Sequence, residues 1–125
     1  MELLDYYMDF LLLNSTVKLE ELDKIYNSIK KAIELKQYFE LHNDGKFCGF
    51  LTWEIRASKS DKDKIDLGIT NLVIQERCRG QYPLIKAINH LRKKYPNIDK
   101  FIWKNRRKNR LFEAKQKDKL CLATS

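Results

Sequence analysis

A short basic turn is the part of the sequence best suited to chemistry. It holds Arg77, Arg79 and Gly80, and it joins a β-rich run over 65–74 to an amphipathic helix that begins at Pro83. Proline suits the first helical position, because its missing N–H would have no helical partner there. Where a strand turns into a helix, several backbone N–H groups point at one place, and the helix dipole adds partial positive charge. With the two arginines these groups favour a phosphate site, although many strand–turn–helix units bind no ligand.

Three cysteines are the next residues with chemical potential. Cys48, Cys78 and Cys121 are an odd number, they form no CxxC pair, and only two histidines accompany them in the chain. Disulfide scaffolds and zinc sites need more ligands at closer spacing. The sequence therefore predicts buried or incidental thiols and no metal site. Cys78 lies between two arginines, an environment that activates thiols, so a reactive thiol is the alternative.

Length and composition limit the class of protein. A chain of 125 residues, of which 34% are charged, is expected to form a single domain over 1–125 with its own core. No run approaches the roughly 18 apolar residues that a membrane span requires. The first residues are acidic and apolar, without the basic start of a secretory signal. We therefore expect a cytoplasmic protein that does not enter a membrane.

Basic residues gather late in the sequence. The formal net charge is +8, and residues 104–119 hold eight basic side chains against two acidic ones. Such a block is typical of a surface for polyanions, such as nucleic acid, nucleotide cofactors or an acidic protein partner. A solvated basic helix is the alternative.

Hydrophobic periodicity predicts both helices and strands. Apolar residues recur every three or four positions in helices and alternate in half-buried strands. Asp44-Gly45 predicts a hairpin turn, because these residues tolerate the positive φ angles of a tight turn. Pro96 ends a helix, since proline cannot continue one. The predicted helices are 3–13, 19–36, 83–94 and 105–117, and the predicted strands are 38–42, 47–55, 65–74, 100–104 and 120–123.

This order of elements predicts the fold class. Two helices precede a hairpin, and a strand–helix–strand unit follows it. A hairpin pairs antiparallel, and a helical crossover pairs its two strands in parallel. The sequence therefore predicts an α+β fold, with a mixed, mostly antiparallel sheet flanked by helices.

Order and residues together resemble the GCN5-related N-acetyltransferase superfamily, in a compact and truncated form, over about residues 17–117. Residues 41–50, Leu-His-Asn-Asp-Gly-Lys-Phe-Cys-Gly-Phe, are similar to the hairpin of that family. Residues 72–80, Leu-Val-Ile-Gln-Glu-Arg-Cys-Arg-Gly, are similar to its strand and pyrophosphate turn, and residues 105–113 to its last helix. The resemblance implies acetyl-CoA or another acyl-CoA as cofactor and an amine as acceptor.

A narrower resemblance points to the toxin-activating lysine acyltransferases and their phage-borne relatives, which are built on the same fold. It is carried by residues 32–38, 50–53 and 91–96. The resemblance implies a protein lysine as acceptor, and it favours a viral or mobile-element origin.

The family resemblance also implies where the cofactor lies. A pantetheine arm would run beside the central strand and bond to its backbone, and the turn after the strand would cradle the diphosphate. Family members have further small residues after the Arg-Gly pair, where this chain has Tyr82 and Leu84. The candidate cofactor-binding residues are Leu72, Val73, Ile74, Arg77, Arg79, Gly80, Gln81 and Asn105.

Acyl transfer to an amine requires a general base. Glu54, Asp66 and His42 are the candidates, and we favour Glu54 because it is near the end of the hairpin strand that should flank the cofactor. The plain alternative is a solvent-facing residue on an alternating strand.

A proton donor for the leaving thiolate is the second catalytic requirement. The family uses a tyrosine of the last helix, and this chain has Phe112 at the matching position. Tyr82 is therefore the candidate acid, and Tyr95 is its alternative.

Two functions from different classes follow. The first is an acyl-CoA-dependent N-acyltransferase that acts on an amine, either a protein lysine or a small molecule. The second is a catalytically inactive domain of the same fold, which binds nucleic acid or a protein partner through its basic C-terminal helix.

Overall fold

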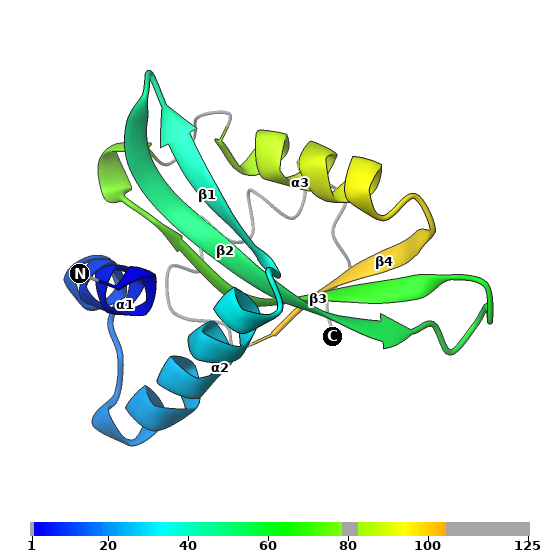
Figure 1. The fold of residues 1–125 in the computed structure, drawn as a ribbon, viewed down its shortest axis with the longest axis horizontal. Coiled ribbons are helices and arrows are strands. Elements are labelled where there is room, and N and C mark those ends of the chain that lie inside the picture. The colour runs from blue at the N-terminus through cyan, green and yellow to red at the C-terminus, as the bar shows by residue number, and fades with distance from the viewer. Residues whose placement is uncertain (1, 79–82, 105–125) are drawn as a thin grey trace.

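The computed structural model describes residues 2–78 and 83–104, and in that part of the chain the elements follow the predicted order (Figure 1). The helices are α1 (Leu3–Asn14), α2 (Leu22–Glu34) and α3 (Pro83–Lys94), the one-turn 3-10 helices are η1 (Leu19–Glu21) and η2 (Glu76–Cys78), and the strands are β1 (Tyr38–Asn43), β2 (Lys46–Ala57), β3 (Ile65–Ile74) and β4 (Ile98–Trp103). The helix predicted at 105–117 and the strand predicted at 120–123 lie outside the described residues. The predicted α+β class is confirmed.

The strands form one mixed sheet in the order β1-β2-β3-β4. β1 and β2 are an antiparallel hairpin, whose turn residues Asp44 and Gly45 have φ angles of 53° and 77°. This is the positive-φ turn that Asp-Gly predicts. β2 and β3 are antiparallel as well. β3 and β4 are parallel, because α3 returns the chain to the end of the sheet at which β3 begins.

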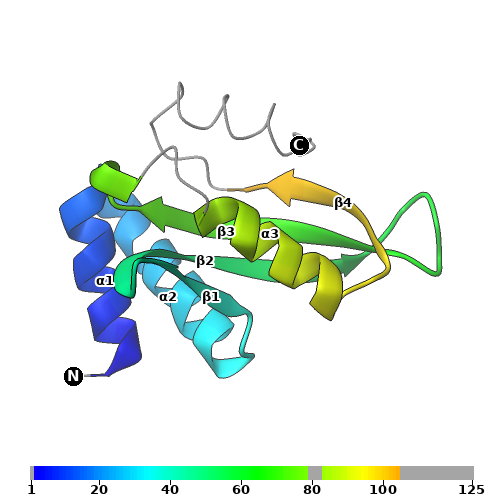
Figure 2. The same cartoon turned by 90° about the horizontal axis from the view of Figure 1, so that it is seen from above.

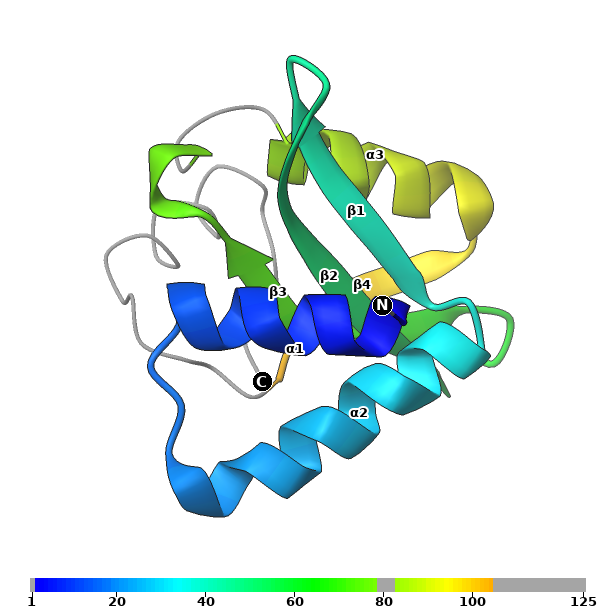
Figure 3. The same ribbon diagram turned by 60° about the vertical axis from the view of Figure 1, so that its left-hand side comes forward.

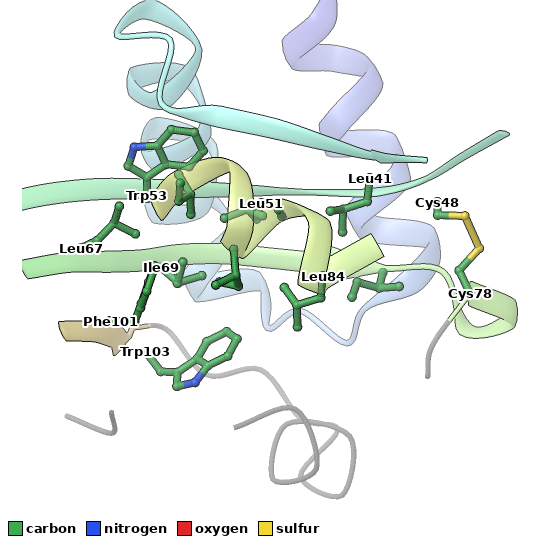
Figure 4. Close-up of a cluster of buried hydrophobic side chains, with 14 residues drawn as sticks. Leu41, Cys48, Leu51, Trp53, Leu67, Ile69, Cys78, Leu84, Phe101 and Trp103 are labelled. Carbon is green, nitrogen blue, oxygen red and sulfur yellow. A yellow bond between two sulfur atoms is a disulfide. The ribbon is translucent and has the colours of Figure 1, made fainter. Parts of the chain in front are cut away.

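α3 packs on one face of the sheet, here called the α3 face (Figures 1 and 2). The buried residues Leu84, Ala87, Ile88 and Leu91 recur at helical spacing along α3. Figure 4 shows the apolar cluster that they form with the sheet. The sheet contributes Leu41, Leu51, Trp53, Leu67, Ile69, Ile74, Phe101 and Trp103.

α1 and α2 pack on the opposite face, here called the α1/α2 face (Figure 3). Tyr7 of α1 is fully buried there and stacks on Phe50 of β2, with 4.2 Å between the ring centroids. Ile25 and Ile29 of α2 and Val73 of β3 complete the same cluster. The sheet is therefore buried on both faces.

The end of α2 differs from the prediction in its boundary. α2 ends at Glu34, and Lys36 takes a left-handed conformation with φ 57°. The N–H groups of Lys36 and Gln37 donate to the carbonyls of Ile33 and Ala32, at 3.1 and 2.7 Å. This pattern satisfies carbonyls at a helix end, so the helix stops and β1 begins. In the described part of the chain no helix has the length and apolarity needed to cross a membrane.

A disulfide joins Cys48 of β2 to Cys78 of η2 (Figure 4). The two residues are 30 positions apart in sequence and their Cα atoms are 6.0 Å apart, a separation that a disulfide spans. The prediction of unpaired thiols was therefore wrong for this pair, although both cysteines are buried as expected. The reason is topological, because the hairpin and β3 bring distant positions to one end of the sheet. Cys121 lies outside the described residues.

Gly49 allows β2 and β3 to approach closely beside the disulfide. It pairs with Ile74, and a Cβ added at Gly49 would collide with the carbonyl oxygen of Val73. Only glycine leaves room for that carbonyl. The end of β3 is thus held by Gly49 and by the disulfide in η2.

Candidate functional site

In the described part of the chain, β4 pairs in parallel with the first half of β3. The last pair is Ile69 and Trp103, and the N–H of Lys104 donates a hydrogen bond of 2.9 Å to the Ile69 carbonyl. β3 then continues to Ile74, still paired with β2, and leads through η2 toward α3. We call the Ile69–Trp103 pair the pairing end.

Three residues predicted to meet a cofactor lie in this last part of β3. Leu72 and Ile74 pack in the α3-face cluster, and Val73 packs in the α1/α2-face cluster. Their side chains therefore belong to the two cores.

A β-bulge lies directly after the pairing end. Thr52 of β2 faces Asn71 and its neighbour Trp53 faces Ile69, so β3 accommodates one more residue, Thr70, than β2 does. A bulge bends the strand and changes the direction of its side chains and peptide groups. Here it brings Thr70 and Asn71 both within hydrogen-bond distance of Thr52.

A buried polar cluster surrounds the bulge on the α1/α2 face. Asn71 Nδ2 donates to Thr52 Oγ1 at 2.9 Å and to Ser28 Oγ of α2 at 3.0 Å. Thr52 Oγ1 and Thr70 Oγ1 share a further hydrogen bond of 2.6 Å. We call these four residues the Asn71 network. It joins α2, β2 and β3 through side chains, three of which are buried.

Glu54, the favoured general base, is placed opposite Gly68 of β3, close to the pairing end. Because side chains alternate along a strand, Glu54 lies on the same face as Thr52. Its Oε1 is 2.9 Å from Lys104 Nζ and 2.9 Å from Arg56 Nη2. Gly68 leaves room for the Glu54 side chain, since a Cβ at position 68 would be 3.2 Å from Glu54 Cγ. The carboxylate is therefore oriented by two cations and is not simply a solvated side chain.

Asp66, one alternative base, is buried in β3 with 5% of its surface exposed. Its Oδ1 has no hydrogen-bond partner among the residues that the structure describes. Asp66 lies three positions before Ile69 in β3, whereas Glu54 pairs with Gly68, the residue next to Ile69. Asp66 is therefore further from the pairing end than Glu54.

His42, the other alternative, belongs to a separate cluster on β1, which is two strands away from β3. Its Nε2 lies 3.1 Å from Glu40 Oε1, and Glu40 Oε2 accepts a hydrogen bond of 2.6 Å from the Tyr7 hydroxyl. Burial and then this hydrogen bond raise the pKa of Tyr7 well above its usual value. The structure thus separates His42 from Glu54 and joins it to α1.

The predicted turn is described only at its beginning. Arg77 is exposed in η2, and its Nε donates to Gln75 Oε1 at 2.8 Å. The predicted residues Arg79, Gly80, Gln81, Tyr82 and Asn105 lie outside the described residues.

Tyr95, the alternative proton donor, follows the last turn of α3. Its hydroxyl accepts a hydrogen bond of 3.3 Å from Trp53 Nε1, on the α3 face. Glu54 points to the other face, so this tyrosine and the favoured base lie on opposite sides of the sheet.

Sequence reasoning missed the Asn71 network and the ion pair of Glu54 with Lys104. A signal was present for the network, because Thr70-Asn71 interrupts an otherwise apolar strand with two polar residues. Buried polar groups in a strand need partners. No comparable local signal exists for Lys104. It contacts Glu54 because the strand order places the end of β4 near this part of β2 and β3.

Comparison with known proteins finds matches among solved structures only. The chain matches no model of a protein family and no curated protein sequence. Solved structures do match. A possible acetyltransferase from Clostridium difficile 630 has a TM-score of 0.64 at 14% identity, over 98% of this chain and 86% of that one. The ribosomal-protein-alanine N-acetyltransferase of Brucella melitensis biovar Abortus 2308 has a TM-score of 0.63 at 11% identity, over 98% and 86%.

A third structure was solved with a bisubstrate analogue. AAC(6')-Iy, in complex with the bisubstrate analogue CoA-S-monomethyl-acetylneamine, has a TM-score of 0.64 at 11% identity, over 96% of this chain and 84% of that one. These three likenesses show that the chain has the fold of N-acetyltransferases, as the resemblance in sequence had led us to expect. At such identities they are evidence for the fold alone.

Proposed function

We propose that this protein is an acyl-CoA-dependent N-acyltransferase that acts on an amine. The observation that carries the proposal is the fold, in which β3 lies within a mixed sheet and leads through η2 toward the start of α3. The fold supports the proposal, since it is shared with an acetyltransferase that was solved with a CoA-containing analogue.

The residues near the pairing end fit an acyl-CoA in two respects. The backbone of Leu72, Val73 and Ile74 is the proposed partner of the pantetheine amides. α3 begins at Pro83 on the far side of the basic turn, so its positive dipole end is directed to the place proposed for the diphosphate. The proposed diphosphate partners are Arg77, Arg79, Gly80 and Gln81, with Asn105 beside them.

Glu54 is the proposed general base. An amine acceptor arrives as an ammonium ion and must lose a proton before it attacks the thioester, and the Glu54 carboxylate is the proposed acceptor of that proton. Arg56 and Lys104 fix the position of one carboxylate oxygen, Oε1. Tyr82 remains the proposed donor of a proton to the leaving thiolate. Acyl-CoA itself supplies the activated acyl group, as a thioester.

The acceptor class is proposed from the narrower resemblance. A protein lysine fits the likeness to toxin-activating lysine acyltransferases, and a small amine is the other option. The phage-type origin and the cytoplasmic location remain predictions from the sequence.

An inactive domain that binds a polyanion is the second candidate. It is favoured by the eight basic residues in 104–119 and by Phe112, which lacks the hydroxyl of the family's tyrosine. Lys104, the one member of this block in the described part of the chain, is engaged by Glu54.

Titration calorimetry with acetyl-CoA distinguishes the two functions. We expect saturable binding, and we expect Arg79→Ala to weaken it by about tenfold to a hundredfold, because a hydrogen bond to a charged group is worth about 1.5–3 kcal/mol. Lys62→Ala, which removes a cation from the exposed loop after β2, is the matched control and should bind as the wild type does. No acetyl-CoA heat, together with binding to a DNA duplex that falls steeply between two salt concentrations, would favour the polyanion-binding domain.

A further inference from the structure

We infer that the outer surface of α3 is a docking surface for double-stranded DNA. The inference goes beyond the proposed function, because it concerns the side of α3 that faces away from the sheet and involves neither the cofactor nor Glu54. It also stands apart from the basic block at 104–119, since α3 ends at Lys94.

The two sides of α3 differ completely in composition. One side is apolar and packs on the sheet, and Figure 1 shows α3 as the outermost described element on that side of the molecule. The other side carries only cationic and neutral polar residues. α3 holds no acidic residue at all, whereas α1, η1 and α2 each have acids in their first turns. The exposed residues of α3 are Lys86, Asn89, His90, Arg92, Lys93 and Lys94.

Three of the exposed residues form a ridge along the helix. At 3.6 residues per turn, Lys86, Asn89 and Lys93 lie opposite the buried stripe. The two lysines are separated by about 10 Å along the axis, at 1.5 Å per residue. A helix with its side chains is about 10–12 Å wide, and the major groove of B-DNA is about 12 Å wide. The ridge therefore fits the groove, with a lysine at each end for the phosphates.

Two further cations flank the ridge and are held by aromatic rings. The guanidinium carbon of Arg92 lies 5.1 Å from the centroid of Phe101, and Lys94 Nζ lies 5.6 Å from that of Trp53. Such contacts restrict a side chain without neutralising its charge, so less ordering is needed on binding. In the part of the chain that the structure describes, the ion pairs are made by Glu40 and Glu54, and none involves a cation of α3.

Charge and surface chemistry together select the partner. Duplex DNA carries one negative charge per about 1.7 Å of its axis, which matches a surface of cations without acids. Binding to single strands depends on aromatic side chains on which bases stack. The one ring among the exposed residues of α3 is His90, and it packs against Phe39 with 4.5 Å between the ring centroids. Binding to a membrane surface requires an apolar side that enters the lipid, and that side of α3 faces the sheet.

The salt dependence of binding to a short DNA duplex, measured by fluorescence anisotropy, tests the inference. In the double variant Lys86→Ala with Lys93→Ala, the slope of log affinity against log salt should be smaller by about 1.8, since each lost phosphate contact removes about 0.9. Lys24→Ala with Lys31→Ala is the matched control. It removes two exposed lysines from α2 at the same spacing, so the net charge changes equally, and it should keep the wild-type slope.

A wild-type slope in the α3 variant overturns the inference, because any affinity for DNA would then reside in other basic residues. A wild-type protein that does not bind the duplex overturns it as well. The same holds if the α3 substitutions weaken binding to the single strand or to phosphatidylserine vesicles but leave duplex binding intact. Titration with acetyl-CoA decides the proposed function separately. If the wild type binds no acetyl-CoA and its duplex binding depends on α3, the proposed function fails and the DNA surface stands.

Discussion

Among the described residues, the α3 face of the sheet is packed with apolar side chains and closed by a disulfide, whereas the α1/α2 face carries hydrogen-bonded polar groups within its core. On the α3 face, Leu51, Trp53 and Ile69 meet the apolar stripe of α3, and Cys48 is bonded to Cys78. On the α1/α2 face, the Asn71 network and the Tyr7–Glu40 hydrogen bond lie beside the stacked aromatic rings.

This difference separates two tasks of one sheet. Apolar burial is non-directional, so the α3 face can supply stability without fixing exact orientations. Hydrogen bonds and ion pairs are directional, so the α1/α2 face can fix the positions of individual groups near the pairing end. Glu54 and Asn71 both belong to that second face. Substitutions on the α3 face should therefore change stability most, and substitutions on the α1/α2 face should change binding and catalysis more than stability.

Trp53→Ala should cause the largest loss of stability. The side chain is 1% exposed, it donates a hydrogen bond to Tyr95, and Lys94 lies 5.6 Å from its ring centroid. Truncating a buried tryptophan costs about 3–5 kcal/mol of unfolding free energy, through lost burial and the cavity that remains. Urea unfolding measures the loss, and Ile55→Ala, at the half-exposed end of the same strand, is the control. A cost below about 1 kcal/mol for Trp53→Ala would break the comparison of the two faces.

Removing the disulfide should have the next largest effect. A crosslink between residues 30 positions apart restricts the unfolded chain, and the chain-entropy estimate for such a loop is about 3–4 kcal/mol. The double substitution Cys48→Ala with Cys78→Ala should lower the melting temperature, and a dithiol reductant should lower that of the wild type but not of the double variant. Cys121→Ala is the control and should keep the sensitivity to reductant. A wild-type melting temperature that is indifferent to reductant, after full reduction is verified by thiol titration, argues against a stabilising role.

Tyr7→Phe tests the polar side of the α1/α2 face through its pH dependence. Burial and the hydrogen bond to Glu40 raise the pKa of Tyr7 in the folded protein, whereas tyrosine in an unfolded chain titrates near 10. The folded state thus holds this proton more tightly. The resulting stability is complete below about pH 10 and is lost progressively as the pH rises above it. Melting temperatures from pH 8 to 11.5 should fall more steeply for the wild type than for Tyr7→Phe, and at pH 8 the variant should be less stable by about 1–2 kcal/mol.

The chain holds five other tyrosines, so only the difference between the two proteins is informative. Tyr26→Phe, on the exposed side of α2, is the matched control and should follow the wild type. Parallel curves for the wild type and Tyr7→Phe would show that this proton does not contribute to folding.

The sequence was sufficient for features that local chemistry decides. Asp44-Gly45 predicted the hairpin, Pro83 the start of α3, and the alternation of strands and helices predicted the mixed sheet. It was insufficient for features that depend on register and on neighbours in space. The bulge at Thr70 arises between two strands, and neither strand alone shows it.

The same reason explains the misjudged and missed contacts. Cys48 and Cys78 are 30 residues apart, and Lys104 is 50 residues after Glu54, so only the finished topology brings each pair together. Glu54 itself was chosen from its place near a strand end, and its role stays a prediction. Contacts between residues distant in sequence are therefore needed to identify the catalytic groups, whereas local signals were enough to predict most of the fold.

Glu54→Gln should have the smallest effect on stability, and it sharpens the comparison because its effect on catalysis should be large. Ion pairs of half-exposed side chains contribute at most about 1 kcal/mol, and Glu54 is 37% exposed beside Lys104 and Arg56. The amide keeps the size of the side chain and cannot accept the acceptor's proton, so the rate should fall by about a hundredfold or more. Release of the CoA thiol from acetyl-CoA, with a lysine peptide as acceptor, measures the rate.

Asp63→Asn, which alters an exposed acid in the loop before β3, should retain wild-type activity. If Glu54→Gln retains the wild-type rate while the affinity for acetyl-CoA is also unchanged, Glu54 is a structural partner of Lys104, and the base must be sought elsewhere, with the buried Asp66 the next candidate.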